Sequence, residues 1–347
     1  MGGTVSTSGT GGRRPGMMDV ARLAGVSHQT VSRVINAPDS VRPETRERVQ
    51  RAIGQLGYRR NMAARALVTD STRTIGVVTA ASHFFGPAST TTAIEDAARA
   101  AGYACLVTAL PDDSDEGVGE VLDFLVNRGV DGVIAVAPRT SIADAATRAS
   151  RRVPLVVVAD GLEPSERIHV VSVDQDLGAR LVVAHLLETG RTRIAHLAGP
   201  RDWYDAAARV RGWRGALEDA GADPGDLIEG DWSAAAGAGS GRALVARLRR
   251  EGSVPDAVFC ANDMMALGLL SALREADVDV PGGVAVVGFD DVDGAAWFAP
   301  PLTTVSQPFA ELGRLSLEVL LEALRGAPGR THSIAPQLVV RASTSSA

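Results

Sequence analysis

The pattern of apolar residues along the chain changes near Ile75. From there on, apolar runs of five to seven residues, rich in β-branched side chains, alternate with stretches of helical spacing. The runs are TIGVVTA, YACLVTA, GVIAVA, PLVVVAD, RIAHLAG, AVFCAND and VAVVGFD. Strands this apolar are buried on both faces, as in a parallel sheet covered by crossover helices. These alternating strands and helices extend over around 270 residues, which is more than a single doubly wound sheet uses. The pattern therefore predicts an α/β sensor with two doubly wound lobes and a ligand cleft between them.

Residues 17–36 have a different pattern, typical of two short helices joined by a tight turn. Gly25-Val26 is the expected turn, and Ser27 is a side-chain N-cap for the second helix. In that helix one face is apolar, with Val31, Val34 and Ile35. Another face is polar, with His28, Gln29, Ser32 and Arg33. The pattern predicts an all-α helix-turn-helix whose polar face can reach base edges and phosphates in a DNA groove. A plain surface helical hairpin is the alternative.

The remaining N-terminal residues suggest where the domains begin and end. A third helix is expected over 43–56, because Pro43 suits a first helical turn and Gly57 a helix end. Asn61 can cap a short alanine-rich helix that runs into a linker. The expected parts are a disordered tail 1–16, a helix-turn-helix domain 17–60, a hinge helix and linker 61–73, a sensor 74–341 and a tail 342–347. Within the sensor, we expect one lobe of 74–161 with 292–325 and another of 162–291 with 326–341.

Charge is distributed unevenly along the chain. The formal net charge is −6, from 35 basic and 41 acidic residues. Residues 1–69 hold 11 of the basic and 4 of the acidic residues, so this segment carries +7 and the rest of the chain −13. A basic head on an acidic body suits a DNA-reading module joined to a domain that does not touch DNA.

The sequence lacks the motifs of the common enzyme classes. We find no Walker loop, no HExxH, no GxSxG elbow and no paired Cys or His spacing for a metal, so neither catalysis nor a cofactor is expected. Cys105 and Cys260 lie in apolar runs, as reduced buried cysteines do. We also find no apolar run of ~20 residues and no export signal, and we therefore expect a cytoplasmic protein.

The motifs and their order resemble the LacI/GalR family of bacterial transcriptional regulators. DVARLAGVSHQTVSRVIN resembles the family's helix-turn-helix, and NMAARAL resembles its hinge helix. Six further motifs resemble its sensor: HLAGP, ARVRGWRGAL, GDWSA, ANDMMALG, VAVVGFDD and PPLTTVSQPFAELG. The resemblance covers nearly everything after Met17 and is strongest to sugar-responsive members. It implies a homodimer that binds a palindromic operator in double-stranded DNA, with a sensor shaped like a periplasmic binding protein.

The resemblance also implies which residues contact DNA. His28 and Gln29 match the base-reading pair, and Gln can bind adenine in a bidentate manner. The other matching positions in the head are Ser27, Thr30, Ser32 and Arg33. In the hinge, Asn61, Ala64 and Leu67 match, and Leu67 is implied to be a wedge that kinks the duplex from the minor groove.

The effector site is implied in the same way. Trp203 and Trp232 match residues that place an apolar face against a sugar ring. Other matching positions in the cleft are Phe84, Phe85, Asp160, Asp205, Arg209, Asn262, Asp290, Gln307 and Phe309. Asp290 follows an apolar strand, where an unpaired buried carboxylate is costly, and Arg209 is a suitable partner. The chain departs from one sugar-responsive member at Trp203 and Asp205, where that protein has small hydroxyl residues. We expect a smaller or more polar pocket at that corner.

The favoured function is thus a repressor of carbohydrate-utilisation genes that a sugar releases from DNA. A repressor of the same family regulated by a purine or a partner protein is one alternative. A transport-type sugar-binding protein is another, but it would have an export signal and no DNA-binding head. Both directions of the response stay open at this point, because a ligand that tightens DNA binding would use the same architecture as one that weakens it.

Overall fold

The structure is a computed structural model that describes residues 15–59, 71–79, 84–110, 115–136, 139, 148–251 and 255–345. The chain forms two compact units, Met1–Asp70 and Ser71–Ala347. The first is called the head below, and the second the sensor. The expected disordered tail lies outside the described residues up to position 14, as do the hinge residues Asn61, Ala64 and Leu67.

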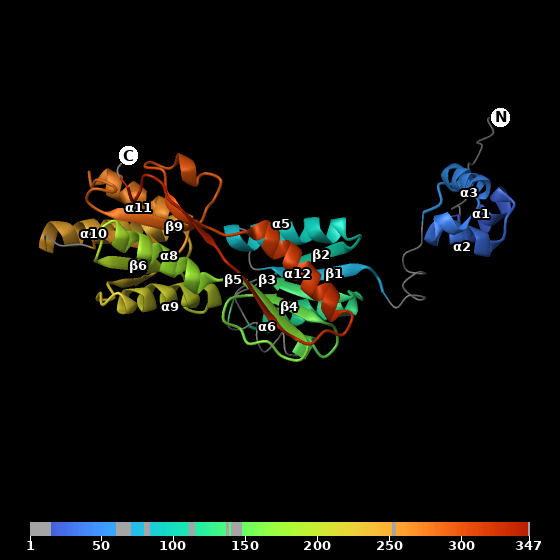
Figure 1. Ribbon diagram of the computed structural model, residues 1–347, viewed down its shortest axis with the longest axis horizontal. Helices are drawn as coiled ribbons and strands as arrows, with labels where there is room; N and C mark the ends of the chain where they lie inside the picture. The colour runs from blue at the N-terminus through green and yellow to red at the C-terminus, as the bar shows by residue number, and fades with distance from the viewer. Residues whose placement is uncertain are drawn as a thin grey trace, which may run out of the picture. The chain divides into compact units, whose positions relative to one another are not determined.

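The head is a three-helix unit around a small aliphatic core. Its elements are α1 (Met17–Ala24), α2 (His28–Asn36), the 3₁₀ turn η1 (Pro38–Ser40) and α3 (Pro43–Leu56) (Figure 1). The Ser27 hydroxyl accepts a hydrogen bond from the backbone N–H of Thr30 at 3.1 Å, as an N-cap does. Gly25 and Gly57 end α1 and α3 in the left-handed conformation, which favours glycine. The core consists of Val20, Ala21, Ala24, Val31, Val34, Val49 and Ala52. The predicted helix-turn-helix is therefore present.

The sensor contains two six-stranded sheets, one in each lobe (Figure 1). The first sheet has the order β11-β5-β4-β3-β1-β2, and the second β12-β10-β9-β8-β6-β7. The first is built from β1 (Thr74–Thr79), β2 (Ala104–Ala109), β3 (Gly132–Val136), β4 (Leu155–Val158), β5 (Ile168–Val173) and β11 (Thr331–Ile334). The second is built from β6 (Ile194–Ala198), β7 (Leu227–Glu229), β8 (Ala257–Cys260), β9 (Ala285–Asp290), β10 (Thr303–Ser306) and β12 (Gln337–Val339). All pairs are parallel except β10 with β12. The α/β fold class is confirmed.

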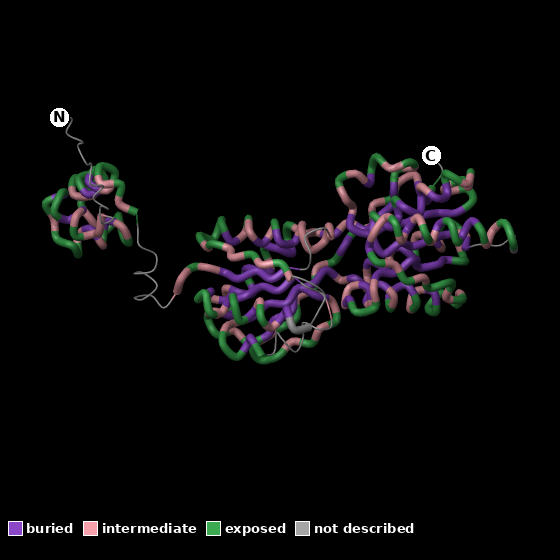
Figure 2. The backbone as a smooth tube through the Cα atoms, turned by 180° about the vertical axis from the view of Figure 1, so that it is seen from behind, coloured by how far each residue is buried: buried purple, intermediate pink, exposed green. Residues whose placement is uncertain are grey.

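Helices cover both faces of each sheet, which is why the central strands are buried throughout (Figure 2). In the first lobe, α5 (Phe85–Ala100) and α12 (Phe309–Ala323) pack on one face and α6 (Asp115–Asn127) on the other. In the second lobe, α8 (Gln175–Glu188) and α9 (Tyr204–Asp219) share one face. The opposite face is covered by α10 (Ala234–Glu251) and α11 (Asp263–Glu275). A 3₁₀ turn, η2 (Ala295–Trp297), follows β9.

The chain crosses between the lobes three times. It passes from β5 to α8, from β10 to α12 and from β11 to β12. The expected lobe boundaries are wrong on this point, because β5 and β11 belong to the first sheet and β10 to the second. An apolar strand can join either of two similar sheets, so its sequence alone does not assign it to a lobe.

Both ends of the sensor also differ from expectation. The linker was expected to run to residue 73, but the Asp131 carboxylate accepts hydrogen bonds from the backbone N–H groups of Thr72 and Arg73, at 2.7 and 2.9 Å. The sensor therefore begins at Ser71. At the other end, Ser343 and Thr344 are buried rather than part of a tail. Ser343 Oγ donates to the carbonyl of Val286 at 2.6 Å, which fixes the segment after β12 against β9.

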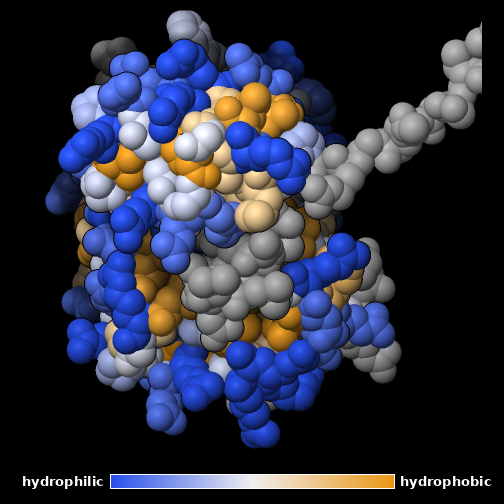
Figure 3. All heavy atoms as spheres, turned by 90° about the vertical axis from the view of Figure 1, so that its right-hand side faces the viewer, coloured by the Kyte–Doolittle hydropathy of each residue, from blue (hydrophilic) through white to orange (hydrophobic). Residues whose placement is uncertain are grey.

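Hydrophilic side chains dominate the face shown in Figure 3, and apolar side chains appear there only in small patches. None of the described helices is both long and apolar enough to span a bilayer.

Candidate functional site

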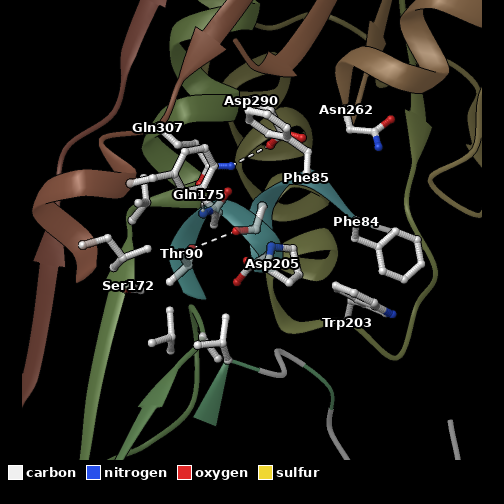
Figure 4. A pocket seen from close by; sticks show the side chains of 18 of the residues that line it. Phe84, Phe85, Thr90, Ser172, Gln175, Trp203, Asp205, Asn262, Asp290 and Gln307 are labelled. Carbon is white, nitrogen blue, oxygen red and sulfur yellow. Dashed lines mark hydrogen bonds between the residues drawn. The ribbon is translucent and has the colours of Figure 1, made fainter. Parts of the chain in front are cut away.

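A pocket lies between the two lobes, beside the first two crossovers. It encloses about 660 Å³ free of atoms, part of it open to solvent. Both lobes contribute to its wall, from strand ends and from the first turns of helices (Figure 4). The lining residues are Phe84, Phe85, Gly86, Pro87, Thr90, Val136, Val158, Ala159, Ser172, Val173, Gln175, Trp203, Asp205, Arg209, Trp232, Asn262, Asp290, Gln307, Phe309 and Leu312.

Arg209, on α9, is the cation of this pocket. Its side chain is nearly fully buried. Nε donates to Gln175 Oε1 at 2.9 Å, and Nη1 donates to the carbonyl of Ala261. The guanidinium carbon lies 3.8 Å from the centroid of the Phe289 ring and 5.6 Å from that of Trp232. Arg209 is therefore held by two hydrogen bonds to neutral oxygens and by two aromatic faces.

Two carboxylates, Asp205 and Asp290, line the pocket near Arg209. Asp205 Oδ1 accepts from the backbone N–H of Asp160 at 3.0 Å, and Asp290 Oδ1 accepts from Gln307 Nε2 at 2.7 Å. Burial raises the pKa of each carboxyl to about 6, although the charge of Arg209 opposes this shift. Asp290 also has a φ of 116°, an uncommon conformation for a non-glycine residue and one often found at functional sites.

Two further carboxylates, Asp160 and Asp263, hold the backbone around the pocket through hydrogen bonds. Asp160 Oδ2 accepts from the backbone N–H of Gln175 at 2.8 Å, and burial raises the pKa of Asp160. Asp263 is fully buried; it accepts from Thr304 Oγ1 at 2.6 Å and from the Val292 N–H at 2.8 Å. Burial, with the nearby Asp290 charge, raises the pKa of Asp263 to about 8. These bonds hold the turn that follows β9 and presents Asp290.

The aromatic corner of the pocket is made by Phe84, Trp203 and Trp232. Trp203 meets the other two rings edge-on, with centroids at 5.3 Å from Phe84 and 5.4 Å from Trp232. Trp232 fits because the neighbouring residue is Gly199, where a Cβ would lie only 2.1 Å from its ring. In addition, Asn262 Nδ2 donates to the carbonyl of Trp232 at 3.0 Å, and its Oδ1 caps α11. Asn262 thus supports the aromatic wall as well as lining the pocket.

Residues of the two lobes meet at this corner. Arg139 follows β3 in the first lobe, and its Nη1 lies 3.3 Å from Asp202 Oδ2 in the second. Its guanidinium carbon is also 5.3 Å from the Trp203 ring centroid. We call Phe84, Arg139, Asp202 and Trp203 the aromatic latch, because their contacts join the two lobes at the wall of the pocket.

Most residues expected in the effector cleft line this pocket. They are Phe84, Phe85, Trp203, Asp205, Arg209, Trp232, Asn262, Asp290, Gln307 and Phe309. Asp160 does not line it but bonds to residues that do. Trp213 is a core residue, and Trp297 is 87% exposed. Sequence reasoning missed Gln175, Ser172 and Thr90. Ser172 lies inside the apolar strand β5, and Gln175 and Thr90 each follow another polar residue, so no local signal marked them.

In the head, the residues expected to read DNA lie at the N-cap of α2 and along the helix as far as Arg33. Ser27, His28, Gln29 and Arg33 are exposed, and Thr30 and Ser32 are partly so. A shallow groove adjoins them, lined by Val26, Ser27, Thr30, Arg33, Ser40, Val41, Arg42, Thr45 and Arg48. Its three arginines and four hydroxyl groups are the donors that phosphate oxygens need. Arg42 and Arg48 were not predicted, because nothing in the sequence shows that the start of α3 turns toward α2.

Comparison with known proteins agrees with this geometry. Residues 16–61 match the family model described as "Bacterial regulatory proteins, lacI family", and residues 183–344 match that of a "Periplasmic binding protein-like domain". The lactose operon repressor of Escherichia coli K12 is 34% identical over 94% of this chain and 90% of its own length. The transcriptional regulator CelR of Thermobifida fusca is 38% identical over 90% of this chain and 93% of its own length.

Solved structures of lacI-family proteins also superpose on this chain over nearly its whole length. A lac repressor dimer bound to operator and the anti-inducer ONPF superposes with a TM-score of 0.86 at 32% identity, covering 96% of this chain and 99% of that one. A CelR–cellobiose complex superposes with a TM-score of 0.70 at 33% identity, covering 95% and 100%. Sequence, fold and pocket agree, and the chain belongs to the lacI family of bacterial regulatory proteins.

Proposed function

We propose that this protein is a transcriptional repressor of carbohydrate-utilisation genes that leaves a palindromic operator when a sugar binds between its lobes. The observation that carries the proposal is that one chain joins a basic helix-turn-helix head to a two-lobed sensor with a pocket between the lobes. The related chains bear the names of repressors of the lactose and ribose operons and of the repressor PurR. A repressor acts on the chromosome and performs no reaction, so we propose no catalysis and a cytoplasmic location.

On the DNA side, α2 supplies the recognition surface. His28 and Gln29 would contact base edges, and Arg33 bases or phosphate. Ser27, Thr30 and Ser32 would contact phosphates, with Arg42 and Arg48 as further cations in the groove beside them. These contacts set the position of the head on the duplex, so base preference and backbone affinity belong to different residues.

A palindromic site requires two heads, and we therefore propose a homodimer. A lac repressor solved on its operator is itself a dimer, which supports this proposal. In the dimer, Asn61, Ala64 and Leu67 of each hinge would contact the operator, and the two Leu67 side chains would enter the minor groove. Sedimentation of the purified chain, with and without operator, checks the dimer.

On the sensor side, the pocket suits a polyol. Trp203 and Trp232 offer apolar ring surfaces, and Asp290 and Arg209 offer an acceptor and a donor for hydroxyl groups. Two relatives were solved with sugar-type ligands, a lac repressor with ONPG and CelR with cellobiose. A purine would use the aromatic walls equally well and is the second candidate.

The two sites would be coupled through the hinge. The Asp131 carboxylate holds Ser71, Thr72 and Arg73, the first residues of the sensor, to the start of β3. A change in the relative position of the lobes would therefore move the end of the hinge. A hinge helix of about two turns is marginal by itself, so it would lose its structure when the two subunits separate at that point.

The proposal is tested with the purified full chain. Binding-site selection identifies the operator, and thermal-shift screening of mono- and disaccharides and purines identifies the effector. We expect one sugar to raise the melting temperature and to lower operator affinity. Stabilisation by purines alone would favour the second candidate, and sequence-blind DNA binding would contradict the proposal.

A further inference from the structure

The charged groups of the sensor pocket carry an inference about its ligand. Of the described residues that line it, only Asp205, Arg209 and Asp290 are charged. In the described part of the chain, Arg209 donates to Gln175 and to the Ala261 carbonyl, not to either carboxylate. One cation and two acids therefore share the pocket without forming an ion pair with each other.

Each carboxylate uses one oxygen to bind the protein. Asp205 Oδ1 is engaged by the backbone of Asp160, and Asp290 Oδ1 by Gln307. Within the described residues, the second oxygen of each has no hydrogen-bond donor from the protein. Neither of these oxygens is among the fully enclosed polar atoms that lack a partner, so each can accept a hydrogen bond from a ligand in the pocket. The two carboxylates therefore favour a ligand that can donate a hydrogen bond to each of them.

Arg209 is already engaged by the protein. Two of its five N–H groups donate to Gln175 and to the Ala261 carbonyl, and its planar faces lie against Phe289 and Trp232. Its remaining N–H groups could bind an anion, but the same anion would also meet two acids of its own sign. One cation beside two acids therefore disfavours an anionic ligand.

We infer that the sensor admits uncharged polyhydroxyl ligands and excludes their phosphorylated and carboxylated counterparts, with Asp205 as the residue that sets this choice. The inference rests on the proposed function and narrows its ligand class. Asp205 is singled out because it adds a second acid to the pocket, near Trp203 and apart from the Asp290–Gln307 pair (Figure 4). Removing its charge leaves one acid to balance one cation.

The experiment compares matched pairs of probes on the full-length protein. Isothermal titration calorimetry at pH 7.5 measures D-glucose against D-glucose 6-phosphate, D-ribose against D-ribose 5-phosphate, and cellobiose and lactose against their aldonic acids. We expect at least one neutral sugar to bind and its anionic counterpart to bind at least about 100-fold more weakly, because like charges are juxtaposed. Asp205→Asn should reduce the ratio of the two dissociation constants, anionic probe to neutral sugar, by about tenfold or more.

The control variant is Asp219→Asn, the same change on the same helix at an exposed residue paired with Arg180. It should leave the ratio unchanged. The melting temperature without sugar shows whether Asp205→Asn is folded, and the wild-type ratio tests the inference independently of either variant. Equal or tighter binding of an anionic probe by the wild type overturns the inference and leaves the sensor function standing. Binding of neither class overturns both.

Discussion

The side-chain amide of Gln175 donates to the side-chain oxygen of Gln307 at 2.9 Å, and both residues are buried. Gln175 begins α8 directly after the first crossover, and Gln307 follows β10 at the second. The bond thus ties two interlobe connections together at the pocket. Gln175 also accepts from Arg209, and Gln307 donates to Asp290. A chain of four side chains, Arg209–Gln175–Gln307–Asp290, links the cation of the pocket to one of its acids.

Gln175→Ala should break this chain. It removes the partner of Arg209 Nε and leaves a buried donor unsatisfied, which costs about 1–3 kcal/mol. We expect sugar affinity to fall by about tenfold or more. Gln337→Ala, which truncates an exposed glutamine of β12, is the control and should bind as wild type. Unchanged calorimetric affinity in Gln175→Ala would show that the chain does not position Arg209.

Asp290→Asn should stabilise the protein at neutral pH while abolishing the sugar response. Burial raises the pKa of Asp290 from 3.8 to about 6, so the folded state binds its proton more tightly than the unfolded state. Wild-type stability contributed by this group is full below about pH 4 and is lost as the pH rises to about 6. Asparagine avoids that loss, and it tolerates the positive φ well.

The expected gain is about 1–3 kcal/mol at pH 7.5, or several degrees in the melting temperature of the sensor, vanishing near pH 4. Scanning calorimetry across this pH range measures it. The exposed Asp123→Asn should show no gain at any pH. A lower melting temperature for Asp290→Asn at pH 7.5 would mean that the carboxylate is net stabilising.

Arg139→Ala should loosen the aromatic latch. It removes the ion pair with Asp202 and the contact with the Trp203 ring, together worth about 1 kcal/mol. Because these contacts exist only while the lobes are joined, we expect the sugar to dissociate about fivefold faster. Stopped-flow tryptophan fluorescence can follow this, with the exposed Arg152→Ala as control. An unchanged dissociation rate would argue against the latch.

Gln29→Ala and Arg48→Ala should separate base reading from backbone binding. Loss of Gln29 should relax base preference at one position per half-site by about 1–3 kcal/mol. Loss of Arg48 should instead weaken all duplexes alike and reduce the dependence of affinity on salt. Binding-site selection and salt titrations measure the two effects. A change of base preference in Arg48→Ala, or none in Gln29→Ala, would contradict the assignment.

Local pattern predicted much of the fold and the site. The N-cap at Ser27, the Pro43 start of α3 and the buried parallel strands depend on neighbouring residues, and the structure contains them. Asp290 and Asn262 could be predicted because polar groups directly after apolar strands reach the carboxyl edge of a parallel sheet. Trp203, Trp232 and Arg209 depended on the family resemblance.

The features that could not be predicted are long-range. The lobe assignments of β5, β10 and β11 depend on which sheet has room for a strand, and no local pattern encodes this. Gln175 is one of three consecutive polar residues at the start of α8, and its importance arises only when Gln307, 132 positions away, folds against it. Likewise, Arg139 meets Trp203 only after the lobes come together.

The account is tested most directly by the affinity of the selected operator with and without saturating sugar. Fluorescence anisotropy at fixed salt measures it, and calorimetry under the same conditions shows that the sensor is occupied. We predict that occupancy weakens operator binding by about 5–150-fold, and that a scrambled duplex shows no such effect. An occupied sensor that leaves operator affinity unchanged would contradict the coupling of the pocket to the head.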